Sequence, residues 1–121
     1  MMSRSVLRWA VIILTVVTAL IHLILGIGGL VGQPDVLSVL FIFNGLGYFA
    51  LLAALFLDVP FFATRRALAH YLLMLFAAVT IVAFFAINFS QLDQQGPAAI
   101  VTKVDELLLI VATFLHLRAS T

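Results

Sequence analysis

Four long apolar runs, separated by short polar segments, make up almost the whole chain. They cover about residues 9–31, 36–57, 65–88 and 97–118. Each is close to the ~20 apolar residues that an α-helix needs to cross a bilayer, and the segments between them are rich in turn-forming and capping residues. The pattern therefore predicts an all-α protein, an integral membrane antiparallel four-helix bundle that forms one transmembrane domain over residues 1–121.

Composition supports a membrane protein over a soluble one. Hydrophobic residues make up 65% of the chain and charged residues only 9%, whereas soluble domains are about 45–50% apolar. A net charge of +1 offers no basic surface for a phosphate backbone, so we expect no nucleic acid as a partner. The apolar composition makes the lipid bilayer the expected partner. The chain has no cysteine, which excludes disulfides and thiolate metal sites.

The distribution of basic residues predicts the orientation in the membrane. Alternating the four spans places five of the six basic residues on one side, and only Lys103 towards the other: Arg4, Arg8, Arg65, Arg66 and Arg118. By the positive-inside rule, both termini are then cytoplasmic in a multi-pass protein of the inner (plasma) membrane. The first run lacks a cleavage site and is longer than a signal-peptide core, so we expect it to be retained.

A group of polar residues falls near the middle of the predicted membrane. With a rise of 1.5 Å per residue, His22, Asn44, Asp105 and Glu106 lie about 3–5 Å from the midplane on its outer side, and Lys103 lies one turn further out. The i, i+3 spacing of Lys103 and Glu106 allows them to pair, and His22 or Asn44 could bond the remaining acceptor sites of the carboxylate. Asp105 points about 100° away from Glu106 around the helix.

Two interpretations of this polar intramembrane cluster stay open. Buried polar groups often do no more than fix the packing of helices. Ionisable residues inside a membrane are also candidates for sites that bind a proton, an ion or a polar ligand. A zinc site formed by His22, Asp105 and Glu106 has no supporting spacing signature, so we predict no metal site.

His70 and His116 form a second group, about 12–13 Å towards the cytoplasm on helices that we expect to be neighbours. Histidines near helix ends are commonly interfacial. The alternative is axial ligation of a tetrapyrrole, either haem or chlorin. The 11 phenylalanines suit lipid contact and packing, but equally a pigment or quinone pocket. The cofactor is therefore left open among haem, chlorin and quinone.

Two short motifs carry a family resemblance. Asn44-Gly45-Leu46-Gly47-Tyr48 lies in the second apolar run, and Lys103-x-x-Glu106 opens the fourth. With the hydropathy pattern, they make the chain similar to a group of short prokaryotic four-helix integral membrane proteins of uncharacterised function. The resemblance implies the fold and no activity.

The function expected from these residues is that of a small structural or accessory subunit in a larger membrane complex, in contact with other membrane subunits or with copies of itself. The sequence contains no catalytic constellation, so we do not expect an enzyme. One alternative is a proton- or ion-coupled transporter or channel that works as an oligomer, with Glu106 as carrier. The other is a haem-, chlorin- or quinone-binding component of electron transfer or light harvesting.

Overall fold

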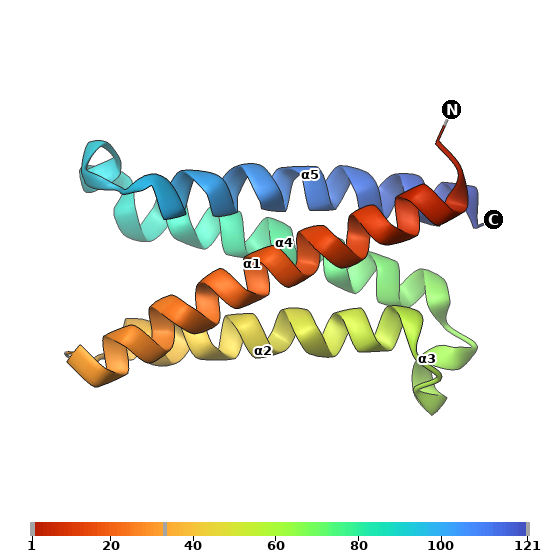
Figure 1. Cartoon of the computed structure of the whole chain (residues 1–121), viewed down its shortest axis with the longest axis horizontal. Coiled ribbons are helices and arrows are strands. Elements are labelled where there is room, and N and C mark those ends of the chain that lie inside the picture. Colours follow the sequence, from red (N-terminus) through yellow and green to blue (C-terminus); the bar gives the residue numbers. More distant parts are fainter. Residues whose placement is uncertain (1, 33, 121) are drawn as a thin grey trace.

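The computed structural model describes residues 2–32 and 34–120, which are helical with short connections (Figure 1). Three segments are long and apolar enough to cross a membrane. They are α1 (Arg4–Gly32), α2 (Val36–Phe56), and α4 (Arg66–Asn88) with the short 3₁₀ helix η1 (Phe89–Gln94) that continues it. A fourth long helix, α5 (Pro97–Ala119), carries three charged residues in its first half, and α3 (Pro60–Ala63) is a single turn.

The helices pack as two hairpins that lean against each other. The first hairpin is α1 with α2 and the second is α4 with α5, and the two meet where α1 contacts α5 and α2 contacts α4 (Figure 1). The described N-terminal residues, α3 and the end of α5 lie at one end of the molecule, and η1 lies at the other. Consecutive long helices therefore run in opposite directions, as their short connections require.

The first helix is longer than the sequence pattern suggests. It begins at Arg4 instead of near residue 9, because Ser3 supplies its start: the Ser3 side-chain oxygen accepts a hydrogen bond from the Val6 amide at 3.2 Å. Hydroxyl side chains favour this position since they satisfy an amide that the helix leaves unpaired. The polar N-terminal residues thus extend the helix beyond the apolar run.

Glycines allow α1 and α2 to approach closely. A Cβ on Gly26 would lie 2.8 Å from the Ser38 carbonyl oxygen, and one on Gly45 would lie 2.8 Å from the Ala19 carbonyl oxygen. Both distances are too short for a side chain, so only glycine permits this backbone contact. The motif around Gly45 is therefore the surface of α2 that packs against α1. This close contact fixes one side of the bundle interior.

Arg66 joins the second hairpin to the first at the end of α2. Its Nη1 donates hydrogen bonds to three carbonyl oxygens, those of Ala54 at 3.1 Å, Leu55 at 2.8 Å and Leu57 at 2.9 Å. Its Nη2 pairs with Asp58 at 3.2 Å. The last carbonyls of a helix have no partner within the helix, so this guanidinium caps α2.

Candidate functional site

Glu106 is the centre of the polar site and is fully buried in the bundle. Its Oε1 accepts a hydrogen bond from Lys103 Nζ at 2.5 Å. Its Oε2 accepts one from Tyr48 OH at 2.7 Å and one from Thr18 Oγ1 at 3.1 Å. One carboxylate thus connects α5 with α1 and α2, and each of its oxygens has a donor. We call these four residues the Glu106 network.

The partners of Glu106 differ from those that the sequence suggested. Neither His22 nor Asn44 bonds the carboxylate; Thr18 and Tyr48 do so instead. Thr18 precedes His22 by four residues and Tyr48 follows Asn44 by four, so each partner lies on the expected face of its helix, one turn nearer the end of the bundle where α1 begins and α2 ends. In both helices the residue that bonds Glu106 therefore differs by one turn from the residue that the estimate from run midpoints suggested.

His22 and Asn44 lie beside the Glu106 network, one helical turn nearer the end of the bundle where α1 ends and α2 begins. His22 Nδ1 is 2.8 Å from the carbonyl oxygen of Thr18, and since a carbonyl only accepts, Nδ1 carries the proton and Nε2 is left as an acceptor. Asn44 Nδ2 donates to Thr80 Oγ1 at 2.8 Å. Asn44 Oδ1 is buried and has no hydrogen-bond partner among the described residues.

Asp105 stands apart from the Glu106 network. It is 7% exposed, and its buried Oδ2 has no hydrogen-bond partner within the described chain. Asp105 and His116 are 11 residues apart, a spacing that puts them on one side of α5, and His116 contacts α4. Asp105 therefore lies on the side of α5 that carries His116. Over residues 2–32 and 34–120, no three histidine, cysteine or acidic side chains come together as metal ligands.

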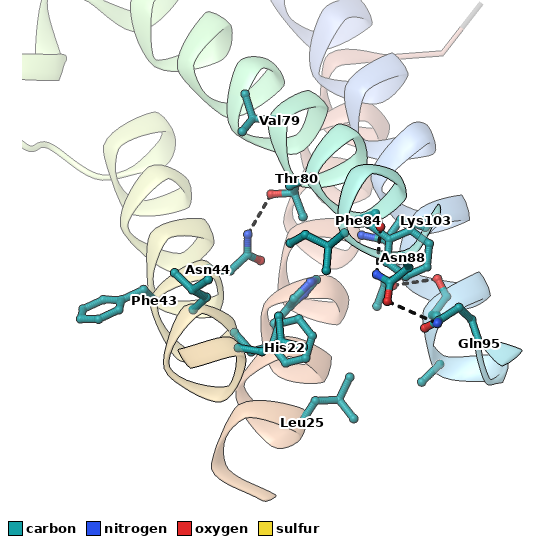
Figure 2. A pocket seen from close by; sticks show the side chains of 18 of the residues that line it. His22, Leu25, Phe43, Asn44, Val79, Thr80, Phe84, Asn88, Gln95 and Lys103 are labelled. Atoms are coloured by element: carbon teal, nitrogen blue, oxygen red, sulfur yellow. Dashed lines mark hydrogen bonds between the residues drawn. The ribbon is translucent and has the colours of Figure 1, made fainter. Parts of the chain in front are cut away.

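A cavity of about 660 Å³ lies between α2 and α4, next to His22 and Lys103 (Figure 2). Its walls are mostly apolar, and its polar side chains include His22, Asn44, Thr80 and Lys103. The Lys103 ammonium group also lies 4.9 Å from the ring centre of Phe84, a cation–π contact. The cavity is lined by helices that are distant from one another in the sequence, so no periodicity in the sequence reveals it.

His70 and His116 contact each other directly. His70 Nε2 is 2.8 Å from His116 Nδ1, and the rings stack with their centres 5.1 Å apart. His70 Nδ1 donates to the Arg66 carbonyl oxygen at 2.7 Å, so His116 Nδ1 donates to the neutral His70 Nε2. The helices are indeed neighbours at this level. In a tetrapyrrole site, nitrogens such as His70 Nε2 and His116 Nδ1 would ligate the metal from the two faces of the macrocycle. Here these two nitrogens bond each other instead.

Together, the helices and their interior define a small all-helical protein in which three helices could cross a membrane and a buried carboxylate joins α5 to the first hairpin. The chain belongs to DUF7475, a family of unknown function, whose model matches residues 1–116. The expected resemblance to an uncharacterised family is thereby confirmed. No curated protein and no solved structure matches the chain.

Proposed function

We propose that this chain is an integral membrane protein whose four long helices all cross the bilayer, and that it serves as a small structural or accessory subunit of a larger membrane complex. The observation that carries the proposal is the Glu106 network. A buried carboxylate with donors on both oxygens, drawn from three helices, is suited to holding those helices in place.

The packing of α5 supports a fourth span. At 1.5 Å per residue its 23 residues reach about 34 Å, enough for the hydrocarbon core of about 30 Å. Its three central charges, Lys103, Asp105 and Glu106, are at most 8% exposed, whereas Val104, Leu107 and other residues of its outer face are apolar and exposed. The helix therefore turns its charges inward, as a membrane span must.

The basic residues support cytoplasmic termini. Arg4 and Arg8 open α1, Arg66 opens α4 and Arg118 closes α5, and these helix ends lie together in Figure 1. A cluster of arginines at one end of a bundle favours the cytoplasmic side.

A structural role suits Glu106 better than a carrier role. A carrier carboxylate has to change its partners during the cycle, whereas Glu106 is fully buried and held by donors on both oxygens. Protonating it would also leave the Lys103 ammonium group without its counter-charge inside the bundle. The long apolar outer surface would then serve contact with lipid and with other subunits.

Cysteine labelling tests the number of spans, because the chain has no cysteine of its own. Single variants Ser3→Cys, Ser90→Cys and Ser120→Cys are treated in intact cells with a membrane-impermeant maleimide. Four spans predict labelling of Ser90→Cys alone. If α5 does not cross, Ser120→Cys labels together with Ser90→Cys, and the proposed topology is wrong.

Purification in a mild detergent tests the accessory role. We expect a membrane partner to co-purify in a fixed ratio and to be lost when an exposed residue of the outer face is enlarged, as in Leu108→Trp, while the protein stays folded. Proton flux in liposomes that disappears in Glu106→Gln would instead support the transporter and contradict the proposal.

A further inference from the structure

The cavity beside the Glu106 network has the size and shape of a ligand site. Its volume of about 660 Å³ lies within the range of roughly 300–1,000 Å³ that is usual for small-molecule pockets. His22 and Lys103 line it, and so do exposed side chains such as Phe43, which is 65% exposed. The cavity therefore opens sideways, between α2 and α4, towards the space that lipid would occupy (Figure 2).

The charge at the polar end of the cavity is balanced. Lys103 contributes a positive charge, and Glu106 pairs with it directly. An anionic head group would add an uncompensated charge in an apolar environment, and a cationic one would meet the Lys103 ammonium group first. A neutral head group suits this site best.

The hydrogen-bonding groups define that head group further. His22 Nε2 and Asn44 Oδ1 are acceptors without a hydrogen-bond partner among the described residues. Lys103 is a donor, and its one described hydrogen bond uses one of its three hydrogens. A ligand that donates to the two acceptors and accepts from the ammonium group therefore needs hydroxyl groups. The rings of Phe41 and Phe84 line the same cavity and suit a flat aromatic ligand.

We propose that this cavity binds a lipid-soluble quinol. Its aromatic head lies against His22, Asn44 and Lys103, and its apolar tail leaves between α2 and α4 into the bilayer. The reduced form binds more tightly than the oxidised quinone, because a carbonyl oxygen can accept from Lys103 but cannot donate to His22 or Asn44. The ligand accepts from a Lys103 hydrogen other than the one that bonds Glu106, so its binding leaves the Glu106 network in place.

Thermal unfolding of the detergent-purified protein measures the binding. Decylubiquinol and decylubiquinone are titrated without oxygen at a fixed detergent concentration. Oleate, which has an apolar chain but a charged head group, is the control ligand. We expect decylubiquinol to raise Tm, with an apparent affinity at least about tenfold above that of decylubiquinone, because the quinol makes two hydrogen bonds, to His22 and Asn44, that the quinone cannot make. Oleate is expected to leave Tm nearly unchanged.

Two aromatic substitutions on α4 test the location. Ala83 lines the cavity, so Ala83→Phe fills it and is expected to abolish the rise in Tm. Ala86 is exposed on the same helix outside the cavity lining, so Ala86→Phe is the matched control and should respond like the parent. A quinol response that survives Ala83→Phe overturns the proposal.

Asn44→Leu tests the head group without filling the cavity. Removing the unpaired acceptor should weaken decylubiquinol and leave decylubiquinone nearly unchanged, so that the ratio of their affinities falls while the bond to His22 keeps it above one. A ¹⁵N spectrum of the imidazoles should show a quinol-dependent shift of His22, assigned with His22→Gln, and none of His70. Equal responses to quinol, quinone and oleate in the parent protein would overturn the proposal.

Discussion

Two buried polar contacts hold α5 in the bundle, and they differ in charge and in the number of partners. In the Glu106 network, an ionised pair receives hydroxyl donors from α1 and α2. At the opposite end, His70 and His116 form a single hydrogen bond between α4 and α5. The first contact is charged and joins three helices, whereas the second is neutral and joins two.

The difference predicts that charge and the number of partners decide how much each contact stabilises the bundle. Losing one member of a buried ion pair leaves the other charged and unpaired, which costs about 3–5 kcal/mol. Losing one neutral hydrogen bond costs about 0.5–1.5 kcal/mol. The two ends of α5 should therefore respond very differently to substitution.

Lys103→Met is expected to have the largest effect. It leaves the fully buried Glu106 carboxylate without its counter-charge, so we expect a loss of about 3–5 kcal/mol in the free energy of unfolding. Unfolding in mixed micelles with increasing denaturing detergent measures it. A change below about 1 kcal/mol would mean that the pair is hydrated and typical of a surface ion pair.

The best rescue of Lys103→Met is Glu106→Gln, because a neutral amide oxygen can still accept from Tyr48 and Thr18. Glu106→Leu would remove the charge but leave both hydroxyls without their acceptor. We therefore expect Lys103→Met with Glu106→Gln to be more stable than Lys103→Met with Glu106→Leu. The reverse order would show that the two hydroxyl bonds contribute little.

Tyr48→Phe is expected to have the next largest effect. The hydroxyl donates to a charged acceptor at 2.7 Å, and such bonds contribute roughly 1.5–3 kcal/mol. Thr18→Val is the paired comparison and should cost less, since its bond to the same oxygen is longer, at 3.1 Å. The same detergent unfolding assay ranks the two variants, and equal losses would contradict the order that the distances give.

The apolar pattern was enough to predict an all-helical protein with helices long and apolar enough to cross a membrane, because helix length and hydropathy are local properties of the chain. The partners of Glu106 were not predictable to the residue. They depend on the register at which the helices pack against one another, which the apolar pattern of a single helix does not contain. The cavity depends on how the two hairpins pack, for example where Gly47 of α2 meets the Phe76 side chain of α4, and such contacts between distant segments are not contained in a local pattern.

A smaller effect is expected from removing the histidine pair. His70→Gln with His116→Gln replaces one neutral hydrogen bond between two helices, so we expect a loss of about 0.5–1.5 kcal/mol and a folded bundle. Thermal unfolding checks this value. An absorption spectrum of the purified parent protein is the companion measurement, and a Soret band lost in the double variant would make the pair a tetrapyrrole site after all.

The smallest effect is expected at Asp35, outside the spans, where it caps α2. The amide and hydroxyl groups of Ser38 donate to Asp35 Oδ1, both at 2.8 Å, and they hold the pKa of this carboxyl below its ordinary value. A lowered pKa in the folded state means that the stabilisation is complete above the ordinary pKa and is lost as the pH falls through the lowered one.

Asp35→Asn isolates this contribution, because asparagine also caps helices but does not titrate near acidic pH. The parent should have the higher Tm near neutral pH, and its advantage over Asp35→Asn should shrink as the pH is lowered towards the carboxyl range. Every other titrating group is common to both proteins and cancels in the difference. A Tm difference that stays constant or grows on acidification would show that the charge of Asp35 adds nothing to the hydrogen bonds that an uncharged cap also makes.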